Sequence, residues 1–131
     1  AQNVNENESG AFTGEVSAKM LDSLGTNFCI VGHSERRKYF NEDNAVLAIK
    51  IKKLLEYQIV PIYCVGEVLE EREAGTHFDV IKKQVEEGLF HLDVADMENV
   101  VIPYSDSLPM LTKYLANTKL IITKIGREVG V

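Results

Sequence analysis

The sequence contains no tryptophan, and it has only two cysteines and three histidines among its 131 residues. Cys29 and Cys64 each lie inside an apolar run, which is typical of small buried thiols rather than of a disulfide or a metal-binding pair. No two histidines have metal-ligand spacing together with a third ligand, so we expect no metal site. These shortages argue against the disulfide-stapled and zinc-binding classes of small protein.

Long apolar runs are also missing, since no segment approaches the roughly 20 residues that span a bilayer. The first ten residues, AQNVNENESG, lack the basic and apolar regions of a signal peptide. We therefore expect a cytoplasmic protein with no membrane partner. The formal net charge of −6 disfavours a nucleic-acid-binding surface.

The composition is that of an ordinary globular protein, with 45% hydrophobic and 26% charged residues. A length of 131 residues suits one domain, residues 1–131, that can bury a substantial core. It is too short for a complete eight-stranded (β/α) barrel, which needs about 200 residues or more.

Apolar runs alternate with helical patterns along the chain, which predicts a parallel α/β sheet. In the helix predicted over 15–24, the apolar positions are Val16, Met20 and Leu24, and Gly25 follows as its C-terminal cap. Five strands are expected, at 1–4, 27–31, 59–65, 100–104 and 119–125, and helices at 15–24, 44–57, 76–89 and 108–117, with a helical turn over 68–73.

Two architectures fit this order of elements. One is an open five-stranded parallel sheet flanked by helices, of the flavodoxin-like or Rossmann-like kind. The other is part of a (β/α) barrel that closes by dimerisation. We favour the open sheet, because a partial barrel leaves two strand edges and a hollow face that a partner must cover.

His33 lies in the most informative segment, FCIVGHSERR at 28–37, where an apolar strand runs directly into a polar cluster. This order places an imidazole at the carboxyl end of a buried strand, where parallel α/β folds carry their chemistry. His77 and His91 lie on or near a predicted helix, and we interpret them as surface or packing residues.

Charged clusters elsewhere have ordinary structural interpretations. Residues 70–73 form a charge run that we expect to be solvated, and Lys50, with two neighbouring lysines, is assigned to the polar side of its helix. Arg36 and Arg37 could pair with Glu35 or Glu67 or contact a partner subunit, and we favour the pairing.

Residues 1–104 resemble the middle of triosephosphate isomerase, from the end of its third strand to its sixth. Five stretches carry the resemblance in the family's order. They are AQN at 1–3, GAFTGE at 10–15, CIVGHSERR at 29–37, CVGE at 64–67 and VIPY at 101–104.

The resemblance implies a segment of a homodimeric (β/α)8 barrel that interconverts dihydroxyacetone phosphate and glyceraldehyde 3-phosphate without a cofactor. His33 would be the electrophile, in a family that is itself a standard example of a neutral catalytic histidine working beside a glutamate base. Glu35 would be its acidic neighbour, Thr13 would reach into the other subunit, Cys64 would be the buried strand cysteine, and Glu67 would be a structural carboxylate. Whether this chain associates with itself stays open.

The chain departs from the family where the catalytic base is expected. The family has Ala-Tyr-Glu-Pro at the end of its sixth strand, whereas this chain has Pro103-Tyr104-Ser105-Asp106. Ser105 therefore stands in the position of the base, and a serine hydroxyl cannot remove a carbon-bound proton near neutral pH as a carboxylate can. We also expect the closing lid, the first two strands and the last two strands with their phosphate loops to be missing.

Residues 105–131 do not resemble the isomerase, and residues 115–126 are weakly similar to a late strand of a Rossmann domain. We therefore predict a chimera or an engineered chain, with a foreign helix–strand tail joined near Tyr104. One of Ser105, Asp106 and Ser107 would cap the helix in this tail, and its N-terminus could bind phosphate or sulfate weakly.

Three functions follow from this sequence. The first is a non-catalytic α/β scaffold, chimeric or designed, that keeps the electrophilic histidine. The second is isomerase activity restored by association with another chain. The third is a module that binds a phosphorylated ligand.

Overall fold

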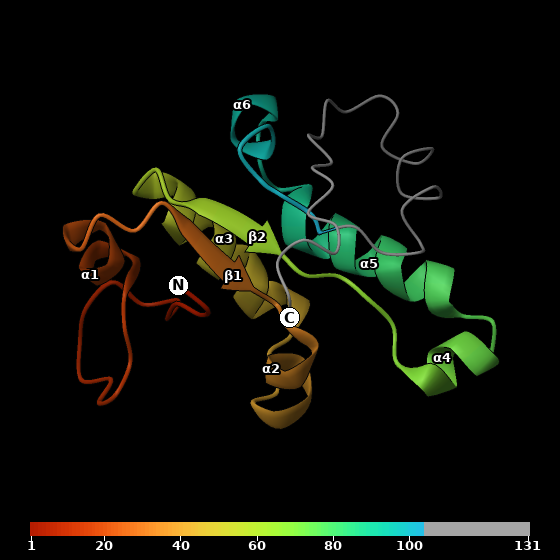
Figure 1. Ribbon diagram of the computed structural model, residues 1–131. Coiled ribbons are helices and arrows are strands. Elements are labelled where there is room, and N and C mark those ends of the chain that lie inside the picture. Colours follow the sequence, from red (N-terminus) through yellow and green to blue (C-terminus); the bar gives the residue numbers. More distant parts are fainter. Residues whose placement is uncertain (104–131) are drawn as a thin grey trace, which may run out of the picture.

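The computed structural model describes residues 1–103, which form an α/β unit built around two parallel strands (Figure 1). Strands β1 (Phe28–Val31) and β2 (Val60–Tyr63) pair with Phe28 opposite Val60 and Val31 opposite Tyr63. The helices are α1 (Ala18–Ser23), α2 (Ser34–Tyr39), α3 (Asn44–Glu56), α4 (Leu69–Glu73), α5 (His77–Leu89) and α6 (Val94–Met97). Within these residues no helix is long and apolar enough to cross a membrane.

The predicted sheet of five strands is not confirmed, because the described residues form a two-stranded sheet. The segment predicted as a strand at 100–104 contributes one parallel bridge, between Val101 and Ile62. At the other edge, Ala1 accepts a hydrogen bond from Ile30 N at 2.9 Å and donates one to Phe28 O at 2.8 Å. The helix predicted at 108–117 and the strand at 119–125 lie outside the described residues.

The spatial order of these segments is consistent with a fragment of a (β/α) barrel, the second of the two architectures considered. Ala1, β1, β2 and Val101 lie side by side in chain order, whereas flavodoxin-like and Rossmann-like sheets reverse direction at a switch point and carry helices on both faces. Here α3 and α5 pack against each other and share one hydrophobic core with the buried face of the strands. Both crossovers therefore cover the same face of the sheet.

Helix α1 is shorter than predicted and buries a different face. It begins after Ser17, whose hydroxyl accepts a hydrogen bond from Met20 N at 3.3 Å, and Gly25 follows it at a φ of +70°. Its buried residues are Ala18 and Leu21, while the three predicted apolar positions, Val16, Met20 and Leu24, are exposed. A helix is present within the predicted range, but the helical spacing of these three residues does not correspond to burial, because spacing alone does not distinguish a core-facing stripe from an exposed one.

Helix α3 matches the helix predicted over 44–57 to within one residue. Leu47, Ile51 and Leu54 in it are fully buried, whereas Leu55 is only partly buried. Lys50 was assigned to the polar side of this helix, and that assignment was wrong, since its side chain is only 4% exposed. Its ammonium group donates to Glu42 Oε1 at 2.6 Å and to Asn3 Oδ1 at 3.0 Å. A buried lysine is stable here because a carboxylate and an amide oxygen replace its water.

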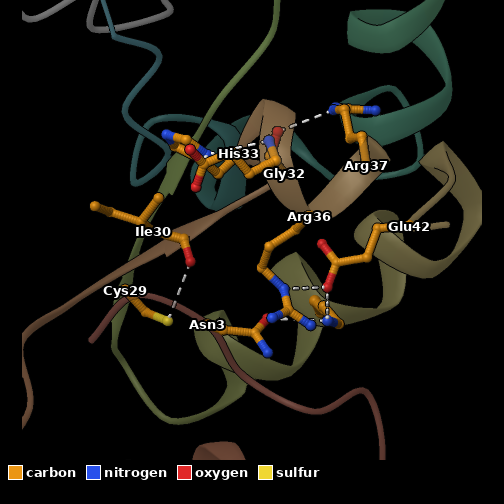
Figure 2. Close-up of polar contacts among 10 residues, drawn as sticks. Asn3, Cys29, Ile30, Gly32, His33, Arg36, Arg37 and Glu42 are labelled. Carbon is orange, nitrogen blue, oxygen red and sulfur yellow. Dashed lines mark hydrogen bonds and ion pairs between the residues drawn. The ribbon is translucent and has the colours of Figure 1, made fainter. Parts of the chain in front are cut away.

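Arg36 completes this buried polar cluster and donates from Nε to the same Glu42 oxygen at 2.7 Å (Figure 2). Burial raises the pKa of Glu42, but the hydrogen bonds from Lys50 and Arg36 outweigh it and hold that pKa below its usual value of 4.5. The cluster ties the start of the chain to α2 and α3. The predicted pairing of Arg36 with Glu35 or Glu67 is therefore replaced by a pairing with Glu42.

Helix α5 lies against the buried phenol of Tyr63, which is the largest fully buried side chain of the described residues. Its hydroxyl donates to Gln84 O at 2.8 Å, and a Cβ at Gly88 would come within 2.4 Å of it. The glycine in α5 therefore makes room for the tyrosine in β2. Thr76 is the residue before α5 but does not cap it through its side chain, because its hydroxyl donates to Glu71 O.

Two short helices, α2 and α6, carried no periodic signal in the sequence. Helix α2 has no buried residue, so it has no apolar stripe for periodicity to detect. Helix α6 has four residues and begins after Asp93, whose carboxylate accepts from Asp96 N at 2.8 Å.

We predict that Glu42→Gln lowers the free energy of unfolding by about 3–5 kcal/mol at neutral pH, because it leaves the buried Lys50 ammonium without a counter-ion. Glu56→Gln removes a partly exposed carboxylate from its pair with Lys53 and should cost about 1 kcal/mol or less. Urea unfolding of the parent chain and of both variants measures these two losses in the free energy of unfolding.

The pairing of Glu42 with Lys50 also predicts how the stability of the fold depends on pH. Because the folded state holds the pKa of Glu42 below 4.5, its contribution to stability is complete above that pH and is lost as the pH falls through the lowered value. The difference in the free energy of unfolding between the parent chain and Glu42→Gln should therefore become smaller as the pH is lowered. A difference that stays constant or grows would contradict the assignment of Glu42 as the buried counter-ion.

Candidate functional site

The loop after β1 places His33 at the carboxyl end of the sheet. Val31 ends the strand, Gly32 turns the chain at a φ of +77°, and His33 is the N-terminal cap of α2. Its Nδ1 accepts a hydrogen bond from the backbone N–H of Glu35 at 3.3 Å. An imidazole nitrogen that accepts a hydrogen bond carries no proton, so this geometry assigns His33 to the neutral form with the proton on Nε2.

A cavity of about 340 Å³ opens beside His33, between the loops that follow β1 and β2. The loop after β2 forms the opposite wall, as expected where the carboxyl ends of adjacent parallel strands meet. The residues around this cavity include His33, Arg37, Cys64, Gly66, Glu67 and Pro103.

Glu67 is the carboxylate of this wall, and its side chain is 9% exposed. Burial raises its pKa, but hydrogen bonds from Arg72, which donates from Nε at 2.8 Å and also from Nη2, outweigh that effect and lower it. Glu67 is therefore an ionised group already paired with a cation. The predicted pairing of Glu67 with Arg36 or Arg37 is replaced by this pair.

Both cysteines are free thiols, as the sequence predicts. Burial raises the pKa of Cys29 to about 11. Burial also raises the pKa of Cys64, although the guanidinium of Arg37 partly opposes it. Since the thiolate is the nucleophile, Cys64 lies in the cavity wall without being activated.

The structure brings three of the predicted site residues together around the cavity: His33, Cys64 and Glu67. The carboxylate of Glu35 lies 3.9 Å from His33 Nδ1 but is 74% exposed and does not line the cavity. Thr13 does not line it either and is exposed in the loop of residues 5–14.

The loop of residues 5–14 is closed by Asn5 N, which donates to Val16 O at 2.8 Å. Tyr57 fastens it to the end of α3 by donating its hydroxyl to Glu8 Oε1 at 2.5 Å, and this bond raises the pKa of Tyr57 to about 12. The ring of Phe12 remains 45% exposed at the tip. Phe12 and Thr13 are therefore exposed residues of a loop whose base is anchored.

Two residues that brace the cavity were missed in the sequence. Arg37 was assigned to an ion pair, but its guanidinium binds backbone and side-chain oxygens beneath the cavity. Gln84 is buried on α5 and binds the backbone of Gly66. A signal for Gln84 does exist, because it is a polar residue among the apolar positions Ile81, Val85 and Leu89. Within residues 1–103, no three histidine, cysteine or carboxylate side chains gather closely enough to hold a metal ion.

These features define a class of protein: a parallel α/β chain with strands in barrel order and a histidine-bearing cavity at their carboxyl ends. Residues 1–105 match the family model of triosephosphate isomerase. The triosephosphate isomerase of Porphyromonas gingivalis is 53% identical over 141 aligned residues, which cover 99% of this chain and 56% of that protein. That of Cytophaga hutchinsonii is 52% identical over 104 residues, covering 79% of this chain and 41% of that protein.

The chain therefore belongs to the triosephosphate isomerase family. It spans about half the length of the curated relatives that it matches, between 41% and 56% in these two cases. The foreign origin of residues 105–131 stays a prediction, and the alignment with the Porphyromonas protein covers nearly all of this chain. The phosphate or sulfate site predicted at residues 105–107 lies outside the described residues.

We predict that Gly32→Ala destabilises the fold by about 1–3 kcal/mol, because the residue has a positive φ and because an added Cβ would lie 3.0 Å from Cys64 O. Gly75→Ala is the matched control, since Gly75 has a φ of +73° but open space around the added Cβ. Thermal unfolding should show a larger loss for Gly32→Ala. Equal losses would mean that the contact with Cys64 contributes nothing.

Proposed function

We propose that this chain carries the electrophilic half of a triosephosphate isomerase-type site and has no isomerase turnover by itself. In this proposal residues 1–104 are a scaffold of that family, and the chain is chimeric or designed from residue 105 onward. The observation that carries the proposal is the placement of the His33 imidazole, whose Nδ1 accepts from the N–H of Glu35 as a helix cap at the edge of a cavity.

The chemistry of an aldose–ketose isomerase requires two groups acting together. A base removes a proton from the carbon next to the carbonyl, and an electrophile donates a hydrogen bond to the carbonyl oxygen as negative charge develops there. With Nδ1 occupied by the N–H of Glu35, the Nε2–H of His33 is the donor available for that oxygen. In this proposal His33 donates from Nε2 as the electrophile, and the hydrogen bond from Glu35 to Nδ1 supports that role.

The base is the part that we propose is missing. Glu67 is the carboxylate among the described residues that line the cavity, and its pairing with Arg72 makes it a weak proton acceptor. Ser105 stands where the family has its glutamate. Loss of a general base alone removes about 10²–10⁴-fold in rate.

The experiment is a coupled triosephosphate isomerase assay on the purified chain, sensitive to a trace of normal turnover. We expect no activity above background for the parent chain or for His33→Asn, in which asparagine keeps the helix cap but removes the imidazole. Turnover in the parent chain that His33→Asn abolishes would overturn the proposed loss of the base while supporting the electrophile. Turnover that His33→Asn leaves unchanged would overturn the role of His33.

A second function, isomerase activity restored by association, is favoured by the open face of the sheet. Phe28 is 55% exposed, and Ile30, Val60 and Ile62 on the same face are only partly buried. Phe12 at the loop tip is also exposed. We propose that another chain, a second copy or a complementing segment, covers these surfaces.

Association is tested by repeating the assay with fragments of the Porphyromonas isomerase that lie outside its alignment with this chain. Activity that appears only in the mixture, and disappears with His33→Asn, would support this second function. If the mixture shows no isomerase activity and sedimentation gives the mass of a monomer, the proposed restoration of activity by association is wrong.

A further inference from the structure

One guanidinium joins the carboxyl ends of the two strands. Arg37 donates from Nε to Gly32 O at 2.9 Å and from Nη2 to Cys64 O at 3.2 Å, so it bridges the residues that directly follow β1 and β2. It also donates to Tyr63 OH at 3.3 Å and to Asn44 Oδ1 at 2.7 Å. These partners are uncharged oxygens, which indicates that the guanidinium is held for its geometry rather than for an ion pair.

The same set of contacts continues under the second wall of the cavity. Tyr63 OH receives the bond from Arg37 and donates to Gln84 O at 2.8 Å. The Gln84 side chain then binds Gly66 twice, accepting from its N–H at 2.8 Å and donating to its carbonyl at 2.9 Å. Hydrogen bonds, linked through the backbone and side chain of Gln84, therefore connect the residue before His33 to the opposite wall.

Close packing fixes the residue before His33 at the same point. A Cβ at Gly32 would lie 3.2 Å from Arg37 Nη2 and 3.2 Å from Tyr63 Cε2. Figure 2 shows the Arg37 side chain reaching back to the Gly32 carbonyl, next to His33. The peptide that carries the imidazole thus rests directly on the guanidinium and the phenol.

We propose that Arg37 is a positioning residue, which acts through the Gly32 carbonyl and the Tyr63–Gln84 path to fix the orientation and tautomer of His33 relative to the opposite wall. This deepens the proposed function, because it concerns the histidine of that site. A lysine cannot replace Arg37, since an ammonium is a point donor and cannot serve Gly32, Tyr63, Asn44 and Cys64 from one plane.

The test reads the imidazole directly by ¹⁵N nuclear magnetic resonance of histidine-labelled protein and needs no turnover. In the parent chain we expect the ¹⁵N chemical shifts of the two His33 ring nitrogens to differ widely, as in a single Nε2–H tautomer. In Arg37→Lys and Arg37→Met the two chemical shifts should become more similar, because the tautomers mix. The signals of His77 and His91 should stay in place, which a general loosening of the fold would not allow.

Lys38→Met is the matched control, because Lys38 is the next residue of α2 and its side chain lies over the exposed Tyr39 ring instead. It should leave His33 unchanged. Guanidinium added to Arg37→Ala at a non-denaturing concentration should restore the separation of the two His33 resonances in part. Tyr63→Phe, which removes one hydroxyl from the path, should give a smaller shift in the same direction.

Unchanged His33 resonances in folded Arg37→Lys and Tyr63→Phe would overturn the proposal, and so would an equal shift in Lys38→Met. If Arg37→Met does not fold, Arg37→Lys and Tyr63→Phe decide the question. If the parent chain holds His33 as the Nδ1–H tautomer, the proposed role of His33 as electrophile is overturned. The role of Arg37 is judged separately, from the difference in His33 resonances between the parent chain and the Arg37 variants. Failure of the two proposals is therefore distinguishable.

Discussion

The parallel pairing of β1 with β2 over a shared layer of helices is the constraint on which the rest of the structure depends. It buries one face of both strands against α3 and α5 and leaves the other face partly open. It also brings the two following loops to the same edge, so that His33 faces the segment from Cys64 to Glu67 across a cavity. These two loops are more than 30 residues apart along the chain, and the pairing of the strands is what brings them together.

Polar groups in the interior follow from the same arrangement. Lys50 and Glu42 can be buried because Asn3, from the start of the chain, accepts a hydrogen bond from Lys50 and Arg36, from α2, donates one to Glu42. Beneath the site, Arg37 works differently, since its recorded hydrogen bonds go to uncharged oxygens. One cluster therefore provides charge compensation and the other provides geometry, although both depend on an arginine of the same short helix.

The parts that could be predicted from the sequence were those with a local cause. The helix predicted over 44–57 is present as α3, in which Leu47, Ile51 and Leu54 follow the helical period and are buried. The motif at 28–37 predicted a histidine at the end of a buried strand, and the structure places His33 at that point. Helix α2 was missed because it buries nothing, and the helical spacing of Val16 and Met20 does not correspond to burial, because these residues have no core to pack against.

By itself the sequence determined the family, the order of the central elements and the histidine at the strand end, because these depend on residue identity and short-range periodicity. Only the tertiary structure decided the barrel-type succession of strands, the burial of Lys50, and the partners of Arg36, Arg37 and Glu67. The physical reason is that a long charged side chain can reach many oxygens. Which of them it binds depends on distances between segments that are far apart in the chain, and these distances exist only after the strands have paired.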